Sequence, residues 1–243
     1  MEYDRYRSTR ELLRKIPRYR SRSLLYPSNV ALHEERTLAL LQAAFSFVVE
    51  HLPLERIDAK LTFALAKVHD DVELAIGMGT EDHRPFAKIH GMNGRYHFEV
   101  DGFDQRELLT LYCENTRLET QLVAYADAFD SLGECVHEVA GGNASFIDMV
   151  TERLDRLRAL ADGYPRMAPL FQTGHPMFAP PDFRVDVLQR IGAHTVETLV
   201  EASGYTPYDF WCKALIHGSV ETYASLLQRR EGIQSQPSQP TAK

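Results

Sequence analysis

Apolar residues recur every three or four positions along most of this 243-residue chain, and that spacing limits the fold to packed helices. The first such run extends from about residue 28 to about residue 50 and ends at Leu52-Pro53. Five further helices are expected, at residues 54–76, 104–139 (one long helix or two abutting ones), 146–161, 182–202 and 207–230. The sequence therefore predicts an all-α fold class.

Two segments depart from the helical spacing. Residues 86–100 contain an Asn-Gly pair followed by alternating apolar residues, which is typical of a β-hairpin. Residues 165–181 hold five of the twelve prolines, which predicts an irregular loop. The expected architecture is a helical bundle with a small β-hairpin insertion around residues 86–100.

The helical pattern indicates a single domain over residues 1–233. Its core is expected at about residues 24–160, and C-terminal helices at residues 182–230 complete it. Residues 234–243 are rich in Ser, Gln and Pro and hold too few apolar side chains to offset the entropy of ordering, which predicts a disordered tail.

The composition is that of a globular protein, with 44% hydrophobic and 25% charged residues, so disorder of the whole chain is excluded. No run approaches the length of a membrane span, and the N-terminal residues are charged where a signal peptide needs an apolar core. We therefore expect a cytoplasmic protein with no membrane partner. The cysteines Cys113, Cys135 and Cys212 lack CxxC spacing, which argues against disulfides or a thiolate metal site.

The net charge of −7 is unevenly distributed, because residues 1–23 hold eight lysines and arginines and three acids. Such a basic arm could bind a phosphate or a nucleic acid. A helix docked on the acidic body of the same chain explains the pattern equally well. We expect no nucleic-acid partner.

The chemistry of the sequence centres on one run of polar residues. There is no Gly-rich phosphate loop with a lysine, no GxSxG elbow and no HExxH motif. The adjacent pair His69-Asp70 can reach one metal ion only if other helices complete the shell, and His33 and a later carboxylate are natural completions. Asp127 lies among apolar residues and needs such a partner. Glu73 follows His69 by four residues, which places both on one face of the predicted helix.

These residues resemble the signature of the HD-domain metal-dependent phosphohydrolases, and most closely that of the small bacterial 5′-deoxynucleotidases. The resemblance covers about residues 10–160. Its elements occur in order along the chain: Arg18-Tyr19, Asn29-Val30-x-x-His33, His69-Asp70-x-x-Glu73, Ala126-Asp127-Ala128 and Ala140-Gly141-Gly142-Asn143.

The resemblance implies a metal site and a reaction. His33, His69, Asp70 and Asp127 would bind one divalent transition metal such as Mn, Co, Fe, Ni or Zn. Glu73 and Asp70 would be the catalytic residues, with Glu73 positioning or deprotonating an attacking water. The implied activity is release of phosphate from nucleoside 5′-monophosphates, with deoxyribonucleotides expected, by in-line attack of a water held by the metal.

The resemblance also implies three substrate-binding positions, and two of them depart from the family. Arg18 would contact the phosphate. Tyr19 would pack on the sugar, where the family typically has Trp. Met78 stands where the family has an acid, and Glu81 and Asp82 are the nearby acids that could replace it. We therefore expect weaker discrimination between ribose and deoxyribose than in the family.

Several alternatives remain open from the sequence. The substrate could be a deoxynucleoside triphosphate or a modified nucleotide, or the chain could be an HD-type module that binds a nucleotide without turnover. Asp130 rivals Asp127 as a ligand and Asp71 rivals Asp70, and we expect both rivals to face outward. We also expect a homodimer.

Overall fold

The computed structural model describes residues 2–19, 22–76, 97–140, 143–173, 175 and 177–178, and it is mostly helical over these ranges. The helices are α1 (Glu2–Leu13), α2 (Val30–His51), α3 (Ala59–Ala66), α4 (Glu73–Ile76), α6 (Gln105–Glu114), α7 (Leu118–Ala140), α8 (Ile147–Gly163) and α9 (Ala168–Phe171). The prediction of an all-α fold is confirmed. The helices expected at 182–202 and 207–230 and the tail at 234–243 lie outside the described residues.

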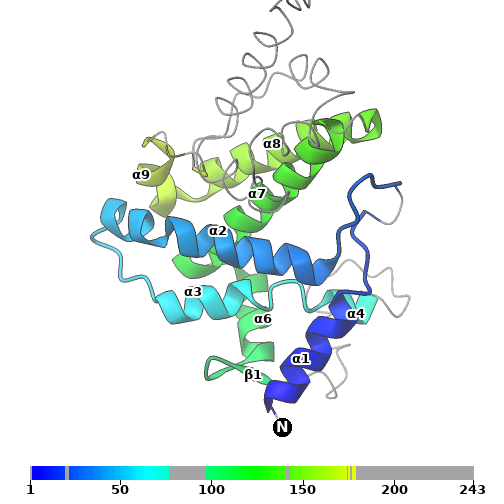
Figure 1. The fold of residues 1–243 in the computed structure, drawn as a ribbon. Coiled ribbons are helices and arrows are strands. Elements are labelled where there is room, and N and C mark those ends of the chain that lie inside the picture. Colours follow the sequence, from blue (N-terminus) through cyan, green and yellow to red (C-terminus); the bar gives the residue numbers. More distant parts are fainter. Residues whose placement is uncertain are drawn as a thin grey trace, which may run out of the picture.

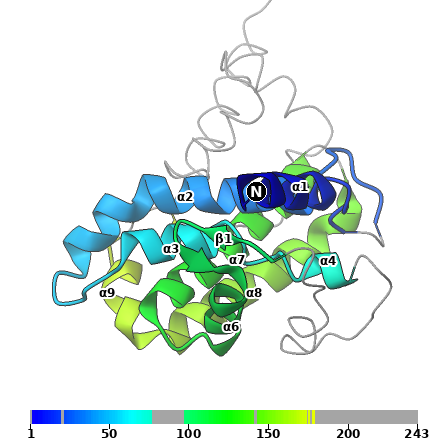
Figure 2. The same cartoon turned by 90° about the horizontal axis from the view of Figure 1, so that it is seen from below.

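Helix α7 is the central element of the fold. It packs against α2, α3, α6 and α8, as Figures 1 and 2 show from two directions. Helix α1 lies near the N-terminal end of α2, and α9 lies near its C-terminal end. Most of α7 is buried on every side, including Leu122, Tyr125, Phe129 and Leu132. Acids on this helix therefore need partners within the protein.

Three helices begin at side chains that satisfy free backbone N–H groups. Asn29 Oδ1 accepts from Leu32 N at 3.0 Å at the start of α2. Asp58 and Asp104 cap α3 and α6 in the same way. Each such cap contributes about 1 kcal/mol. The cap at Asn29 also fixes where α2 begins, and thereby the position of His33 in its first turn.

The prediction of a single helix at residues 54–76 is wrong. The chain forms α3, then turns through residues 67–72, and resumes as the short α4. The hydrogen bonds Val68 N to Leu65 O, Asp71 N to Val68 O and Glu73 N to Asp70 O join residues three apart, which is tighter than an α-helix. These turns aim successive polar side chains at different buried partners, and such contacts override helix propensity.

The stretch expected as one long helix or two abutting ones at 104–139 is two helices. Asn115 ends α6 in the left-handed conformation, with φ 50°. Asn tolerates that conformation better than other residues with a side chain. The chain then restarts as α7 at Leu118.

The described β-hairpin lies later than the segment that the sequence indicates. Strands β1 (Glu99–Val100) and β2 (Phe103–Asp104) pair antiparallel around Asp101-Gly102. Both turn residues have positive φ, 52° and 79°, which an Asp-Gly pair accommodates in a two-residue turn. The Asn-Gly pair on which the prediction rests lies outside the described residues.

Two other segments are more regular than the sequence suggests. Part of the expected loop at 165–181 forms a 3₁₀ helix, η3 (Pro165–Met167), followed by α9. Another 3₁₀ helix, η2 (Ala144–Phe146), leads into α8.

The basic arm begins with α1, where Leu13 and Arg10 are buried against the body of the protein. For these residues, the structure agrees with the second interpretation of the basic arm, a helix docked on the acidic body of the same chain.

None of the helices in the described ranges combines the length and the apolar character needed to cross a membrane.

Candidate metal centre

Three of the four predicted ligands lie close to one atom of the fourth, His33 Nε2. His69 Nε2 lies 3.4 Å from it, Asp70 Oδ2 3.5 Å and Asp127 Oδ1 3.0 Å. They come from α2, from the turns after α3 and from α7. His33, His69 and Asp70 form a group of possible metal ligands whose atoms all lie within 4.8 Å of one another, and Asp127 stands next to this group through its contact with His33.

These separations suit one cation. Ligand atoms about 2.1 Å from a common ion lie about 3.0 to 3.4 Å from each other in octahedral or tetrahedral geometry. Two imidazole nitrogens and two carboxylate oxygens are a donor set that suits first-row transition metals. The residues present therefore fit the metal that the resemblance implies.

Hydrogen bonds on the far side of each imidazole ring orient the ligand atoms. His69 Nδ1 donates to Ala66 O at 3.0 Å, which in the neutral ring leaves a lone pair on Nε2. His33 Nδ1 lies 2.7 Å from Asp130 Oδ2, and a proton there likewise leaves a lone pair on Nε2. The His33 lone pair then faces another acceptor, Asp127 Oδ1. A positive charge between these two acceptors satisfies both, whether it is a proton on Nε2 or a bound metal ion, and metal-binding histidines are typically supported in this way.

The pKa values of His33, His69 and Asp127 are shifted because these side chains are buried close to one another. Burial and the charge of Arg18 oppose a proton on His33, but hydrogen bonds to Asp127 and Asp130 raise its pKa to about 9. Burial lowers the pKa of His69. Burial favours neutral Asp127, but the hydrogen bond from His33 and the positive charges around it hold its pKa well below the usual range.

The second oxygen of Asp127 is held from two further helices. Tyr112 Oη, on α6, donates to Asp127 Oδ2 at 3.3 Å, and Arg156 Nη2, on α8, lies 3.2 Å from the same oxygen. Asp127 thus presents Oδ1 to His33 while protein donors fix Oδ2. The sequence analysis named neither Tyr112 nor Arg156.

Asp130 and Asp71 do not face outward, so that prediction is wrong. Asp130 is 1% exposed and accepts hydrogen bonds at 2.8 Å from Nε and Nη2 of Arg36. Asp71 is fully buried, pairs with Arg10 and accepts from Gln105. Both acids are buried because a cation or amide meets them inside the protein.

A second group of possible ligands, formed by His33, Asp130 and Glu134, is already neutralised. Arg36 pairs with both acids, and Arg18 Nε lies 2.8 Å from Glu134 Oε2. A helical projection of α7 could have revealed this network. Five of its polar residues follow the spacing i, i+3, i+4, i+7 and i+11, which places them on one face of the helix: Asp127, Asp130, Ser131, Glu134 and Glu138.

A cavity of about 630 Å³ opens beside the four ligands. His69, Asp70 and Asp127 lie in its wall, and so does Glu73. The prediction that Glu73 shares a helix face with His69 fails, because the chain turns between them and Glu73 begins α4. The two side chains nevertheless face the same cavity. Tyr112, Asn115 and Tyr164 contribute hydrogen-bonding groups to its wall.

Arg18 also lies in this wall, but its donors are directed at protein groups. Nη1 lies 3.5 Å from Asp70 Oδ2, and Nη2 donates to Ser131 Oγ at 2.8 Å. Its side chain is 14% exposed. Arg18 therefore stands beside the proposed metal ligand Asp70, where the resemblance expects a phosphate contact.

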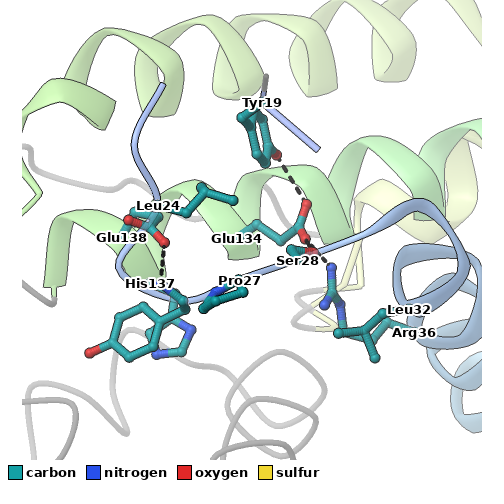
Figure 3. A pocket seen from close by; sticks show the side chains of 10 residues that line it. Tyr19, Leu24, Pro27, Ser28, Leu32, Arg36, Glu134, His137 and Glu138 are labelled. Atoms are coloured by element: carbon teal, nitrogen blue, oxygen red, sulfur yellow. Dashed lines mark hydrogen bonds and ion pairs between the residues drawn. The ribbon is translucent and has the colours of Figure 1, made fainter. Parts of the chain in front are cut away.

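Tyr19 lines a different cavity, of about 290 Å³, together with Arg36 and Glu134 (Figure 3). Its hydroxyl donates to Glu134 Oε2 at 3.1 Å, and its ring packs edge-on against Phe146. It is not among the residues that line the cavity beside the metal ligands. Met78, the third predicted substrate contact, lies outside the described residues, as do Glu81 and Asp82.

Comparison with known proteins gives structural likeness only. No family model and no curated protein matches the sequence. The structure is similar to a conserved hypothetical protein from Pyrococcus furiosus (20% identity, TM-score 0.50, covering 68% of this chain and 95% of that one). It is also similar to the PH0347 protein from Pyrococcus horikoshii (19% identity, TM-score 0.52, covering 76% and 98%).

An HD-domain phosphohydrolase from Listeria innocua matches at 20% identity and a TM-score of 0.49, over 80% of this chain and 100% of that one. At identities this low, likeness extends to the fold and not to the activity. The chain therefore shares its helical fold with the two Pyrococcus proteins.

Proposed function

We propose that this protein is an HD-domain metal-dependent phosphohydrolase that releases phosphate from nucleoside 5′-monophosphates, with deoxyribonucleotides as the expected substrates. One observation carries the proposal. The ligand atoms of His69, Asp70 and Asp127 all lie within 3.5 Å of His33 Nε2, beside a cavity that arginines also line. The motif resemblance described above supplies the reaction class.

His33, His69, Asp70 and Asp127 are the residues that would hold the metal. When bound, a divalent transition metal lowers the pKa of water and offsets the charge of a phosphoryl oxygen. The protein contributes the fixed orientation of its ligands. Asp130 and the Ala66 carbonyl set the imidazole rings, while Tyr112 and Arg156 set Asp127.

Glu73 lies in the same wall and is the proposed general base. Its carboxylate would take a proton from the attacking water as the water oxygen bonds to phosphorus. The bond between phosphorus and the 5′-oxygen breaks in line with that attack, and the 5′-oxygen takes a proton from solvent, to which Glu73 afterwards returns the proton that it removed. The cavity volume is within the range of pockets that take small molecules, about 300 to 1,000 Å³.

The test is phosphate release from a panel of nucleoside mono- and triphosphates, in paired ribo- and deoxyribo-forms, with Mn²⁺, Co²⁺ or a chelator. Metal-dependent release from monophosphates, abolished by the chelator, is the expected result. Selective release from a triphosphate would replace the monophosphate assignment. Nucleotide binding without turnover under any metal would favour the module without catalysis.

A further inference from the structure

The three arginines in the cavity wall differ in their exposure and in how many protein groups their guanidinium nitrogens already contact. Arg18 has an acid or a hydroxyl near each of its guanidinium nitrogens and is 14% exposed. Arg153 is 20% exposed and lies 3.3 Å from Glu152. Arg156 is 43% exposed, and within the described part of the chain its one ion pair is with Asp127. Arg156 is therefore the most exposed of the three arginines in this wall.

Arg156 is also the arginine whose single ion pair is to a proposed metal ligand. Its Nη2 lies 3.2 Å from Asp127 Oδ2, and the other oxygen of that carboxylate faces His33 at 3.0 Å. A guanidinium has five N–H donors in a planar fork, so one contact to Asp127 leaves most of them for a ligand. A phosphoryl group beside the four metal ligands would share the cavity with these donors.

The described lining residues include three arginines and three carboxylates: Arg18, Arg153, Arg156, Asp70, Glu73 and Asp127. Two of these arginines also pair with acids outside the lining, Arg18 with Glu134 and Arg153 with Glu152. Among the described residues, Arg156 is therefore the arginine of the wall whose charge is least offset by acids outside the cavity.

We propose that Arg156 is a phosphate-binding residue, which holds Asp127 with one edge of its guanidinium and a phosphoryl oxygen of a monoester with the other. This inference rests on the proposed function, because it places the phosphate at the same metal centre. It also assigns the accessible phosphate contact to a residue of α8, while Arg18 supports Asp70 and Glu134.

The test measures binding, independently of turnover. Inorganic phosphate is titrated into the Mn²⁺-loaded full-length protein by calorimetry, for wild type, Arg156→Gln, Arg156→Lys and Arg158→Gln. Arg158 lies on the same helix, is 54% exposed, pairs with Asp155 and is not among the residues lining the cavity, which makes it a matched control. Mn²⁺ affinity is measured for each variant in parallel.

Arg156→Gln should weaken phosphate binding by roughly 10-fold or more, since a charged donor is lost, while Mn²⁺ affinity stays within roughly 3-fold. Arg156→Lys should recover part of the loss because it keeps the charge without the fork. Arg158→Gln should bind as wild type does. For a monophosphate substrate, the Arg156→Gln variant should show the change mainly in KM.

Two results would overturn the inference about Arg156 alone. Unchanged phosphate affinity in Arg156→Gln would show that the residue makes no contact with phosphate. A parallel loss of Mn²⁺ affinity, with phosphate binding restored at saturating Mn²⁺, would make it a positioning residue for Asp127. Failure of the wild-type protein to bind Mn²⁺ at all would instead refute the proposed function, and the phosphate assignment with it.

Discussion

His33 Nδ1 and Asp130 Oδ2 lie 2.7 Å apart, on the side of the imidazole ring that faces away from the other proposed ligands. This buried contact keeps a proton on Nδ1 and directs Nε2 toward Asp127, Asp70 and His69. Asp130 itself stays charged because Arg36 binds it through two nitrogens. Burial opposes that charge, yet Arg36 and His33 hold the pKa of Asp130 well below its usual range.

Asp130→Asn should therefore lower the affinity for Mn²⁺ by roughly 10- to 100-fold, the usual cost of removing a carboxylate that supports a histidine ligand. Calorimetric titration with Mn²⁺ measures the effect, and circular dichroism verifies that the variant is folded. Asp155→Asn, an exposed substitution on α8, is the control. Equal affinities in the two variants would show that Asp130 does not support the site.

Glu73→Ala and Asp70→Ala should separate catalysis from metal binding. Loss of Glu73 should leave the Mn²⁺ affinity largely intact and lower kcat by roughly 10²-fold or more, as expected for a general base. Loss of Asp70 should abolish metal binding because a carboxylate ligand is removed. If both variants bind Mn²⁺ and turn over nucleotide as wild type does, the mechanism is wrong.

Arg10→Met should strongly destabilise the fold. Arg10 is buried between Glu34 and Asp71 and pairs with both, and Glu34 also accepts from the backbone N–H of Asp70 at 3.1 Å. Removing the cation leaves two buried carboxylates without it, which costs about 3 to 5 kcal/mol. Urea denaturation measures the loss, and Arg7→Met, at an exposed position of α1, should change the unfolding free energy by about 0.5 kcal/mol or less.

His137 should make the fold sensitive to acid. Its ring stacks on Tyr26 with centroids 3.8 Å apart, and burial lowers its pKa to about 3. The unfolded chain takes up this proton near pH 6.5, so between these values the unfolded state binds more protons than the folded state. The contribution of His137 to stability is therefore present above about pH 6.5 and is lost as the pH falls, by up to about 1.4 kcal/mol per pH unit.

His137→Phe keeps an aromatic ring against Tyr26 and removes the titration. Urea denaturation of both proteins at pH 7.5, 5.5 and 4.5 should show the wild type losing stability relative to the variant at the two lower values. A difference that stays constant across the three values would contradict the assignment.

Helical periodicity was enough to predict the class of the fold and the start of α2, because both depend on local spacing and on the cap at Asn29. The break at residues 67–72 was not predictable in this way. Its cause is tertiary, since Asp71 turns inward to Arg10 on α1 and to Gln105 on α6, which are distant in the sequence. The spacing of residues along the sequence does not show which distant residues come into contact.

The proposed site likewise has a part that the sequence could predict and a part that it could not. The four proposed ligands could be named from a resemblance of motifs, and in the structure the other three lie within 3.5 Å of His33 Nε2. The residues that orient them belong to no motif: Tyr112 and Arg156 reach Asp127 only because α6 and α8 pack beside α7. The pairing of Tyr19 with Glu134 likewise depends on how the N-terminal segment crosses α7. Residue identity alone could not assign Tyr19 to the second cavity.

The Asp127 carboxylate meets side chains from α2, α6 and α8, so the wall around it consists of packed helices. Evolution can exchange a surface loop with little effect on its neighbours, whereas a shift of one packed helix changes the geometry of everything it touches. Adaptation to a new substrate would then be concentrated at apolar wall positions such as Val72 and Leu160. Substitutions there could reshape the cavity while the ligand geometry is inherited unchanged.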